Sequence, residues 1–529
     1  MRRKKPASHL SSRPQRIFLP FSFLTSPYLI PPPLPFFIPP LPLLCSADGQ
    51  GRRASQVRCA PSERAMAARG GARAVAPAAL LLLLLLASGG GGGVHCLRSR
   101  GGERRHGPGA AAPRQLCSGG KSRAEEAHAV LASDAARVSS LQRRIGSYGL
   151  IRSSDAASAS KLAQVPVTSG ARLRTLNYVA TVGIGGGEAT VIVDTASELT
   201  WVQCEPCDAC HDQQEPLFDP SSSPSYAAVP CNSSSCDALR VATGMSGQAC
   251  DDQPAACSYT LSYRDGSYSR GVLAHDRLSL AGEDIQGFVF GCGTSNQGPF
   301  GGTSGLMGLG RSQLSLISQT MDQFGGVFSY CLPPKESGSS GSLVLGDDAS
   351  VYRNSTPIVY TAMVSDPLQG PFYLANLTGI TVGGEDVQSP GFSAGGGGKA
   401  IVDSGTIITS LVPSVYAAVR AEFVSQLAEY PQAAPFSILD TCFDLTGLRE
   451  VQVPSLKLVF DGGAEVEVDS KGVLYVVTGD ASQVCLALAS LKSEYDTPII
   501  GNYQQKNLRV IFDTVGSQIG FAQETCDYI

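Results

Sequence analysis

The chain has 529 residues, with 41 lysines and arginines, 45 aspartates and glutamates, and a formal net charge of −4. This length has room for two domains or one large bilobal domain. Charged residues make up only 16 % of the chain, which argues against coiled coils and charged disordered tails. The 59 glycines and 34 prolines favour a turn-rich β protein.

The charge is divided unevenly along the chain. Residues 1–164 carry 24 basic and 7 acidic residues, whereas residues 165–529 carry 17 and 38. A body this acidic does not suit a phosphate backbone, so we expect no nucleic-acid partner. His211 and His275 are the only histidines after residue 164, which nearly excludes multi-histidine zinc chemistry there.

Residues 66–96 have the pattern of a signal peptide. Met66 begins a basic stretch, seven leucines follow at 80–86, and small residues come next. The apolar run is too short to span a bilayer comfortably, so we expect no stable membrane span. We expect translation to start at Met66, which makes residues 1–65 a doubtful extension. An organelle transit peptide, and hence a chloroplast location, is the less favoured alternative.

Residues 97–164 are rich in arginine, serine and alanine, and we expect them to form a propeptide. The apolar spacing between Ala124 and Arg144 predicts one helix. A short basic helix ahead of an acidic body indicates a segment held partly by charge. A disordered linker is an equal alternative for the first half of this segment.

The sequence from about Val165 is typical of β structure. The β-branched runs at 178–182 and 190–193 flank glycines at 185–187, which predicts a hairpin. These glycines lack the G-x-G-x-x-G spacing and precede a strand, so nucleotide binding is disfavoured and we expect no cofactor.

Twelve cysteines follow residue 164, and an even number fits disulfides in an oxidising compartment. Cys204, Cys207 and Cys210 also have the spacing of zinc ligands, next to His211. Seven cysteines fall between residues 204 and 257 without a second histidine, so we favour a disulfide-stapled loop and expect no metal. The twelve are Cys204, Cys207, Cys210, Cys231, Cys236, Cys250, Cys257, Cys292, Cys331, Cys442, Cys485 and Cys526.

The most informative feature is an internal duplication. Residues 192–197 are Ile-Val-Asp-Thr-Ala-Ser, and residues 401–406 are Ile-Val-Asp-Ser-Gly-Thr. Each motif is followed by an apolar-apolar-glycine triplet that ends at Gly308 or Gly501. One Asp-Ser-Gly is only a turn, but two such pairs indicate two related halves.

With these motifs, residues 165–529 resemble the pepsin-like aspartic proteases, and more narrowly the plant nepenthesin-like group. The resemblance implies a mainly β, bilobal fold with a pseudo-twofold axis, a cleft between the lobes and a few short helices. The N-terminal lobe would span 165–345, with a cysteine-rich insertion at 204–257, and the C-terminal lobe would span 346–529.

The resemblance implies an aspartic endopeptidase that is made as a zymogen and hydrolyses proteins or peptides at acid pH as a monomer. Asp194 and Asp403 would be its catalytic pair. Two carboxylates a few ångströms apart cannot both ionise easily, so one keeps a proton. One then acts as general base toward a water and the other as general acid toward the substrate carbonyl. A pepsin-like protein that binds or inhibits without catalysis is the alternative.

The resemblance also assigns supporting residues. The hydroxyls beside each aspartate would tie the two turns together and bind the carboxylates, and a tyrosine on a flap would close over substrate. Ala196 stands where most relatives have glycine, and we expect it to keep a negative φ. These residues are Thr195, Ala196, Ser197, Ser404, Gly405 and Thr406 at the pair, Tyr263, Gly266 and Ser267 on the flap, and Trp201, Gly308 and Gly501 as structural neighbours.

The resemblance further implies four disulfides among the eight cysteines from Cys204 to Cys292. Cys442 would pair with Cys485, and Cys331 with Cys526. Three glycosylation sequons begin at Asn232, Asn354 and Asn376. With the cysteines they indicate the secretory pathway, and the sequence does not choose between the cell wall and the vacuole.

Overall fold

The computed structural model describes residues 15–18, 123–145, 161–243, 250, 256–262, 267–334, 338–366, 370–392 and 398–528. The expected signal peptide at 66–96 lies outside the described residues, and so do Tyr263 and Gly266. The described helices are α1 (Arg123–Arg144), α2 (Ser234–Thr243), α3 (Leu316–Gln319), α4 (Met321–Phe324) and α5 (Pro413–Gln426).

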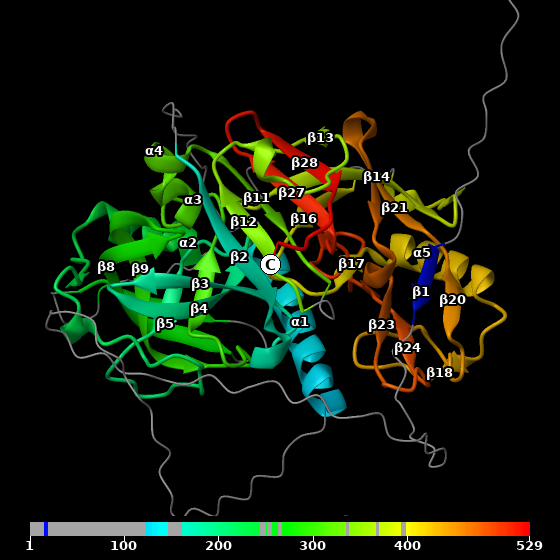
Figure 1. Cartoon of the computed structure of the whole chain (residues 1–529), viewed down its shortest axis with the longest axis horizontal. Coiled ribbons are helices and arrows are strands. Elements are labelled where there is room, and N and C mark those ends of the chain that lie inside the picture. The colour runs from blue at the N-terminus through cyan, green and yellow to red at the C-terminus, as the bar shows by residue number, and fades with distance from the viewer. Residues whose placement is uncertain are drawn as a thin grey trace, which may run out of the picture. The chain divides into compact units, whose positions relative to one another are not determined.

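A 14-stranded sheet forms the N-terminal lobe and continues to the C-terminal strands (Figure 1). Its order is β13-β28-β27-β11-β12-β2-β3-β4-β10-β5-β9-β8-β6, with β7 paired to β8. The strands are β2 (Ala163–Ser169), β3 (Tyr178–Ile184), β4 (Gly187–Asp194), β5 (Trp201–Gln203), β6 (Ala227–Ala228), β7 (Ser258–Ser262), β8 (Tyr268–Leu280), β9 (Glu283–Gln297), β10 (Gly305–Gly308), β11 (Val327–Cys331), β12 (Gly341–Leu345), β13 (Val359–Ala362), β27 (Leu508–Asp513) and β28 (Gln518–Gln523).

The C-terminal lobe contains an 8-stranded and a 4-stranded sheet. The first follows the order β22-β21-β14-β16-β26-β17-β25, with β15 beside β14, and the second the order β18-β19-β24-β23. Their strands are β14 (Leu374–Val382), β15 (Glu385–Asp386), β16 (Lys399–Val402), β17 (Thr409–Leu411), β18 (Gln432–Ala433), β19 (Cys442–Phe443), β21 (Leu456–Phe460), β22 (Glu465–Val468), β23 (Leu474–Val476), β24 (Val484–Leu486), β25 (Leu488–Ser490) and β26 (Ile499–Ile500). β1 (Gln15–Phe18) pairs with β20 (Glu450–Val453).

The duplication seen in the sequence is a duplication of strand pairs. β4 runs parallel to β10, with Asp194 opposite Gly308. β16 likewise runs parallel to β26, with Val402 opposite Ile500. Each aspartate therefore stands at the end of a buried strand beside its own apolar-apolar-glycine strand. The mainly β, two-lobed fold expected from the sequence is confirmed.

Helix α1 forms where the sequence predicts a helix, and it contacts both lobes. Its buried side chains Leu131, Asp134, Val138 and Leu141 follow one another at intervals of three or four residues, as expected for one face of a helix. Leu131 packs into the cluster of Ile407 and Ile408 in the C-terminal lobe. Val138 and Leu141 join the large core shared by both lobes.

Candidate active site

Asp194 lies at the end of β4, and its carboxylate has no exposed surface. The backbone N–H of Ala196 donates to its Oδ1 at 3.0 Å, and the Ser197 hydroxyl donates to its Oδ2 at 2.6 Å. The turn after the strand therefore holds both carboxylate oxygens.

Asp403 follows β16 and is held by the same pattern. The Gly405 N–H donates to Oδ1 at 2.8 Å, and the Thr406 hydroxyl donates to Oδ2 at 2.6 Å. Burial raises the pKa of Asp403, and the negative charge of Asp194 raises it further, while Arg137 opposes both. Because of this raised pKa, Asp403 is suited to be the partner that keeps a proton.

The hydroxyl residues after the aspartates join the two lobes. The Thr195 N–H donates to Ser404 Oγ at 3.1 Å, and the Ser404 N–H donates to Thr195 Oγ1 at 3.0 Å. Each hydroxyl then donates to the opposite strand, Thr195 to the Val402 carbonyl at 3.2 Å and Ser404 to the Val193 carbonyl at 2.9 Å. These four bonds fix the two aspartate turns face to face.

Sequence reasoning missed a second symmetric pair of hydroxyls. Thr200 accepts a hydrogen bond from the Gly308 N–H at 3.1 Å, and Thr409 accepts one from the Gly501 N–H at 3.0 Å. Each threonine lies six residues after its aspartate, so the repeat itself contained the signal. A Cβ on Gly308 would lie 2.6 Å from the backbone of Glu198, which explains the glycine.

Ala196 does not have a positive φ. Its N–H still binds Asp194, so the methyl group leaves the turn intact. Gly405 occupies the matching position in the other lobe, where a Cβ would lie 2.4 Å from Asp194 Oδ1. The two small residues are therefore not equivalent, because only Gly405 is required sterically by the position of the carboxylate.

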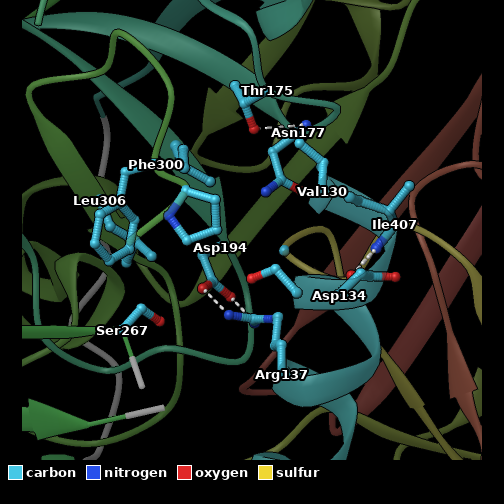
Figure 2. Close-up of a pocket in the computed structure, with 14 residues that line it drawn as sticks. Val130, Asp134, Arg137, Thr175, Asn177, Asp194, Ser267, Phe300, Leu306 and Ile407 are labelled. Atoms are coloured by element: carbon cyan, nitrogen blue, oxygen red, sulfur yellow. Dashed lines mark hydrogen bonds and ion pairs between the residues drawn. The ribbon is translucent and has the colours of Figure 1, made fainter. Parts of the chain in front are cut away.

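Two other expected site residues have clear positions. Ser267 is buried just before β8 and lines the same pocket as Asp194 (Figure 2). Trp201 is fully buried in β5, and its ring meets Phe300 edge to face at 5.1 Å between centroids. Trp201 therefore belongs to the core next to the site.

Helix α1 inserts a cation between the two aspartates, and the sequence did not single out this residue. Arg137 Nη1 and Nη2 lie 2.8 and 2.7 Å from the two oxygens of Asp194. Nη2 also lies 3.1 Å from Asp403 Oδ2, and Nε lies 3.3 Å from Thr406 Oγ1. Figure 2 shows the guanidinium pointing directly at Asp194. The guanidinium therefore contacts both carboxylates at once.

One turn before Arg137, Asp134 binds the opposite wall of the pocket. Its carboxylate accepts hydrogen bonds from the backbone N–H groups of Ile407 at 2.8 Å and Ile408 at 3.0 Å. Burial raises the pKa of Asp134 to about 6, although these bonds and Arg137 lower it. The sequence predicted the helix, but it could not show which side chains enter the pocket.

The chain is similar in sequence to known families and proteins. Families described as xylanase inhibitor N-terminal and xylanase inhibitor C-terminal match residues 178–347 and 372–523. An aspartyl protease family protein of Arabidopsis thaliana is 41 % identical over 415 residues, which cover 77 % of this chain and 84 % of that protein. The chain belongs to the nepenthesin-like group of pepsin-like aspartic proteases.

A second relative of this protease is the aspartic proteinase nepenthesin-1 of Nepenthes gracilis. It is 35 % identical over 344 residues, or 64 % of this chain and 75 % of that one. The solved structure of edgp covers 69 % of this chain and 96 % of its own at a TM-score of 0.56 and 22 % identity. Basic 7S globulin from soybean covers 69 % and 97 % at a TM-score of 0.55, also at 22 % identity. These two structures support the fold alone.

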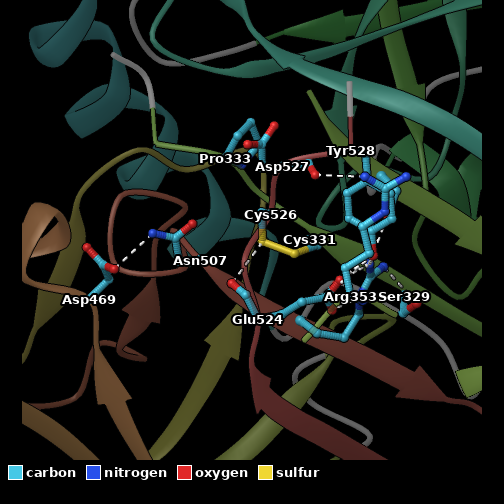
Figure 3. The surroundings of a disulfide bond; sticks show 12 residues. Ser329, Cys331, Pro333, Arg353, Asp469, Asn507, Glu524, Cys526, Asp527 and Tyr528 are labelled. Carbon is cyan, nitrogen blue, oxygen red and sulfur yellow. Dashed lines mark hydrogen bonds and ion pairs between the residues drawn. A yellow bond between two sulfur atoms is a disulfide. The ribbon is translucent and has the colours of Figure 1, made fainter. Parts of the chain in front are cut away.

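The described disulfides of the protease agree with the expected pairings. Cys442 bonds Cys485, and Cys331 bonds Cys526 (Figure 3). The three cysteines with zinc-like spacing are all used in disulfides. The remaining bonds are Cys204–Cys292, Cys207–Cys210, Cys231–Cys250 and Cys236–Cys257.

The three sequons of the protease differ in exposure. Asn232 and Asn354 are exposed, whereas Asn376 is half-buried in β14. The first two are therefore the accessible acceptors for a glycan. Among the described helices, none is long and apolar enough to cross a membrane.

Proposed function

We propose that this chain is the zymogen of an acid-active aspartic endopeptidase, in which α1 blocks the catalytic pair until it is removed. The observation that carries the proposal is the Arg137 guanidinium, bound to Asp194 at 2.7 and 2.8 Å and to Asp403 at 3.1 Å. A partly buried cation here offsets the negative charge of the carboxylates and excludes both water and substrate from the space between them. Neither carboxylate is then able to serve as base or acid.

Once α1 has left, we assign the two aspartates different roles. In the precursor, burial and the charge of Asp194 raise the pKa of Asp403, so we assign the proton to Asp403 and the carboxylate to Asp194. Asp194 takes a proton from a water as the water oxygen attacks the substrate carbonyl carbon, and Asp403 protonates the carbonyl oxygen. The tetrahedral intermediate then collapses. The nitrogen takes the proton that Asp194 holds, a hydroxyl of the intermediate returns its proton to Asp403, the C–N bond breaks, and an acid and an amine leave.

Acid pH would release α1 through Arg137. Since Arg137 lowers the pKa of Asp403, it binds the ionised pair more tightly than the protonated pair. This attraction is therefore present at neutral pH and is lost as the carboxylates take protons. The acidic residues that predominate after residue 164 also attract the basic segment before it. This attraction, too, weakens as the pH falls and the acidic residues take protons.

Twelve cysteines in disulfides and two exposed sequons support a place in the secretory pathway. We propose that the protease is glycosylated and works outside the cell or in the vacuole as a monomer. Its partners would be protein or peptide substrates.

The test is to incubate the purified precursor at pH 7 and at pH 4 and to follow cleavage of a generic protein substrate. We expect no cleavage at pH 7, and at pH 4 cleavage that begins as N-terminal sequencing detects loss of α1. A precursor that cleaves at full rate while α1 is intact would contradict the zymogen. A processed protein that cleaves nothing would favour the binding or inhibitor function.

A further inference from the structure

Besides the contacts of Arg137 and Asp134, α1 makes a further specific contact with the C-terminal lobe. Gln142 Nε2 donates to the Thr497 carbonyl oxygen at 2.6 Å, and the Thr497 N–H donates to Gln142 Oε1 at 2.7 Å. One side-chain amide therefore binds both backbone groups of one residue. With α1 in place Thr497 is only 5 % exposed and Gln142 is half-buried, so these two bonds are partly shielded from water.

The position of this contact relates it to the scissile bond. Gln142 follows Arg137 by five residues, which is ~7.5 Å along a helix axis. An extended substrate covers that distance in about two residues. Thr497 itself is held in place, because the next residue, Pro498, accepts a hydrogen bond from the Ile401 N–H at 2.9 Å, two residues before Asp403.

We propose that in the processed protease the backbone N–H and C=O of Thr497 form a subsite for a primary carboxamide side chain, glutamine above all, about two residues from the scissile bond. This inference rests on the proposed removal of α1. Gln142 occupies the subsite in the precursor, and a glutamine of the substrate takes the same two bonds afterwards.

The backbone N–H and C=O of Thr497 together favour a side-chain carboxamide over other side chains. A carboxamide carries one acceptor and two donors, so it satisfies the N–H and the C=O together. Leucine satisfies neither, and an ionised glutamate accepts but cannot donate. A partly buried site built for paired polar groups discriminates strongly against a side chain that leaves them unmatched. The carboxamide is also uncharged, so it keeps both bonds at the acid pH of the proposed reaction.

The test uses the acid-processed protease and a panel of fluorogenic peptides. Each of the three positions on either side of the scissile bond carries glutamine, leucine or glutamate in turn. We expect kcat/KM to be at least tenfold higher for glutamine than for leucine at one position, about two residues from the cleaved bond. At that position glutamate should approach glutamine near pH 3, where it is protonated and able to donate, and should fall behind near pH 5.5.

Two variants separate backbone recognition from other effects. Thr497→Pro removes the N–H that would bind the amide oxygen, so the ratio of kcat/KM for the glutamine peptide to that for the leucine peptide should fall to about one. Thr497→Ala keeps the backbone groups and should keep the preference. If Thr497→Pro does not fold, the pH series with glutamate on the unaltered protease decides.

The same assays distinguish failure of the proposed protease function from failure of the carboxamide subsite. If no peptide is cleaved, the proposed function itself is wrong. If peptides are cleaved and glutamine and leucine agree within twofold at all six positions, only the carboxamide subsite is overturned. A glutamine preference that survives Thr497→Pro would also overturn it.

Discussion

Thr195 and Ser404, one from each lobe, exchange hydrogen bonds in which each backbone N–H donates to the hydroxyl of the other residue. The four bonds of this group lie directly beneath the two carboxylates. The distance between Asp194 and Asp403 is therefore set by the junction of the lobes.

Removing one of these hydroxyls should loosen the junction. Thr195→Val leaves the Ser404 N–H and the Val402 carbonyl without the bonds they make now. An unsatisfied buried group costs ~1–3 kcal/mol, so the free energy of unfolding should fall by about that amount. Urea unfolding measures it. Thr195→Ser keeps the hydroxyl and is the control, and equal stability of the two variants would contradict the prediction.

The two carboxylates should act as one unit. Asp194→Asn and Asp403→Asn, each processed by added wild-type protease, should lose more than about a hundredfold in kcat, or ~2.7 kcal/mol. The double variant should be little worse than either single one. Single-turnover assays on all three variants provide the comparison. A single variant that keeps a tenth of the wild-type kcat would remove its residue from the catalytic pair.

The small residues after the aspartates should respond differently. Gly405→Ala places a methyl group against Asp194, so we expect it to lose more than about a hundredfold in kcat/KM, or ~2.7 kcal/mol. Ala196→Gly should change kcat/KM by less than about tenfold, or ~1.4 kcal/mol. Peptide assays at acid pH compare the two variants with wild type. An inactive wild type that Ala196→Gly activates would show instead that the alanine disables the site.

Arg137 should set the pH at which the precursor is processed. Arg137→Ala removes the cation from the carboxylates, so processing should begin at a higher pH than in wild type. Arg143→Ala removes the same charge from an exposed position on the same helix and should leave the pH of processing unchanged. The half-time of processing across a pH series gives the result. Equal shifts in both variants would mean that only the net charge of α1 matters.

Asp134 should stabilise the precursor more at acid pH than at neutral pH, whereas the attraction of Arg137 weakens at acid pH. Its pKa is about 6 in the folded precursor, compared with an ordinary value of 3.8. Because the folded pKa is the higher one, this contribution to stability is fully present below pH 3.8 and is lost as the pH rises through 6. Relative to Asp134→Asn, wild-type precursor should gain up to ~3 kcal/mol between pH 7 and pH 4. Denaturant unfolding at both pH values tests this, and a difference that does not change with pH would refute it.

Some features of the fold and the site could be predicted from the sequence, and others could not. The repeated Asp-hydroxyl-small-hydroxyl motif indicated two related halves, because it is a local pattern that occurs twice. The family resemblance carried by that motif implied the two lobes, the dyad and the hydroxyls around it. The pairing of Cys331 with Cys526 followed only from the family resemblance. The role of Arg137 had no local signal, because it depends on how α1 docks against aspartates 57 and 266 positions away.

The last described strands have a consequence for biosynthesis. β27 and β28 complete the sheet that begins in the N-terminal lobe, since β27 pairs with β11, and Cys526 closes a loop of 195 residues back to Cys331. While the ribosome is still making residues 346–507, β11 has an unpaired edge and Cys331 a free thiol. The first lobe is therefore unable to finish folding during its own translation. Until the final strands emerge, it has to be protected from pairing with other chains.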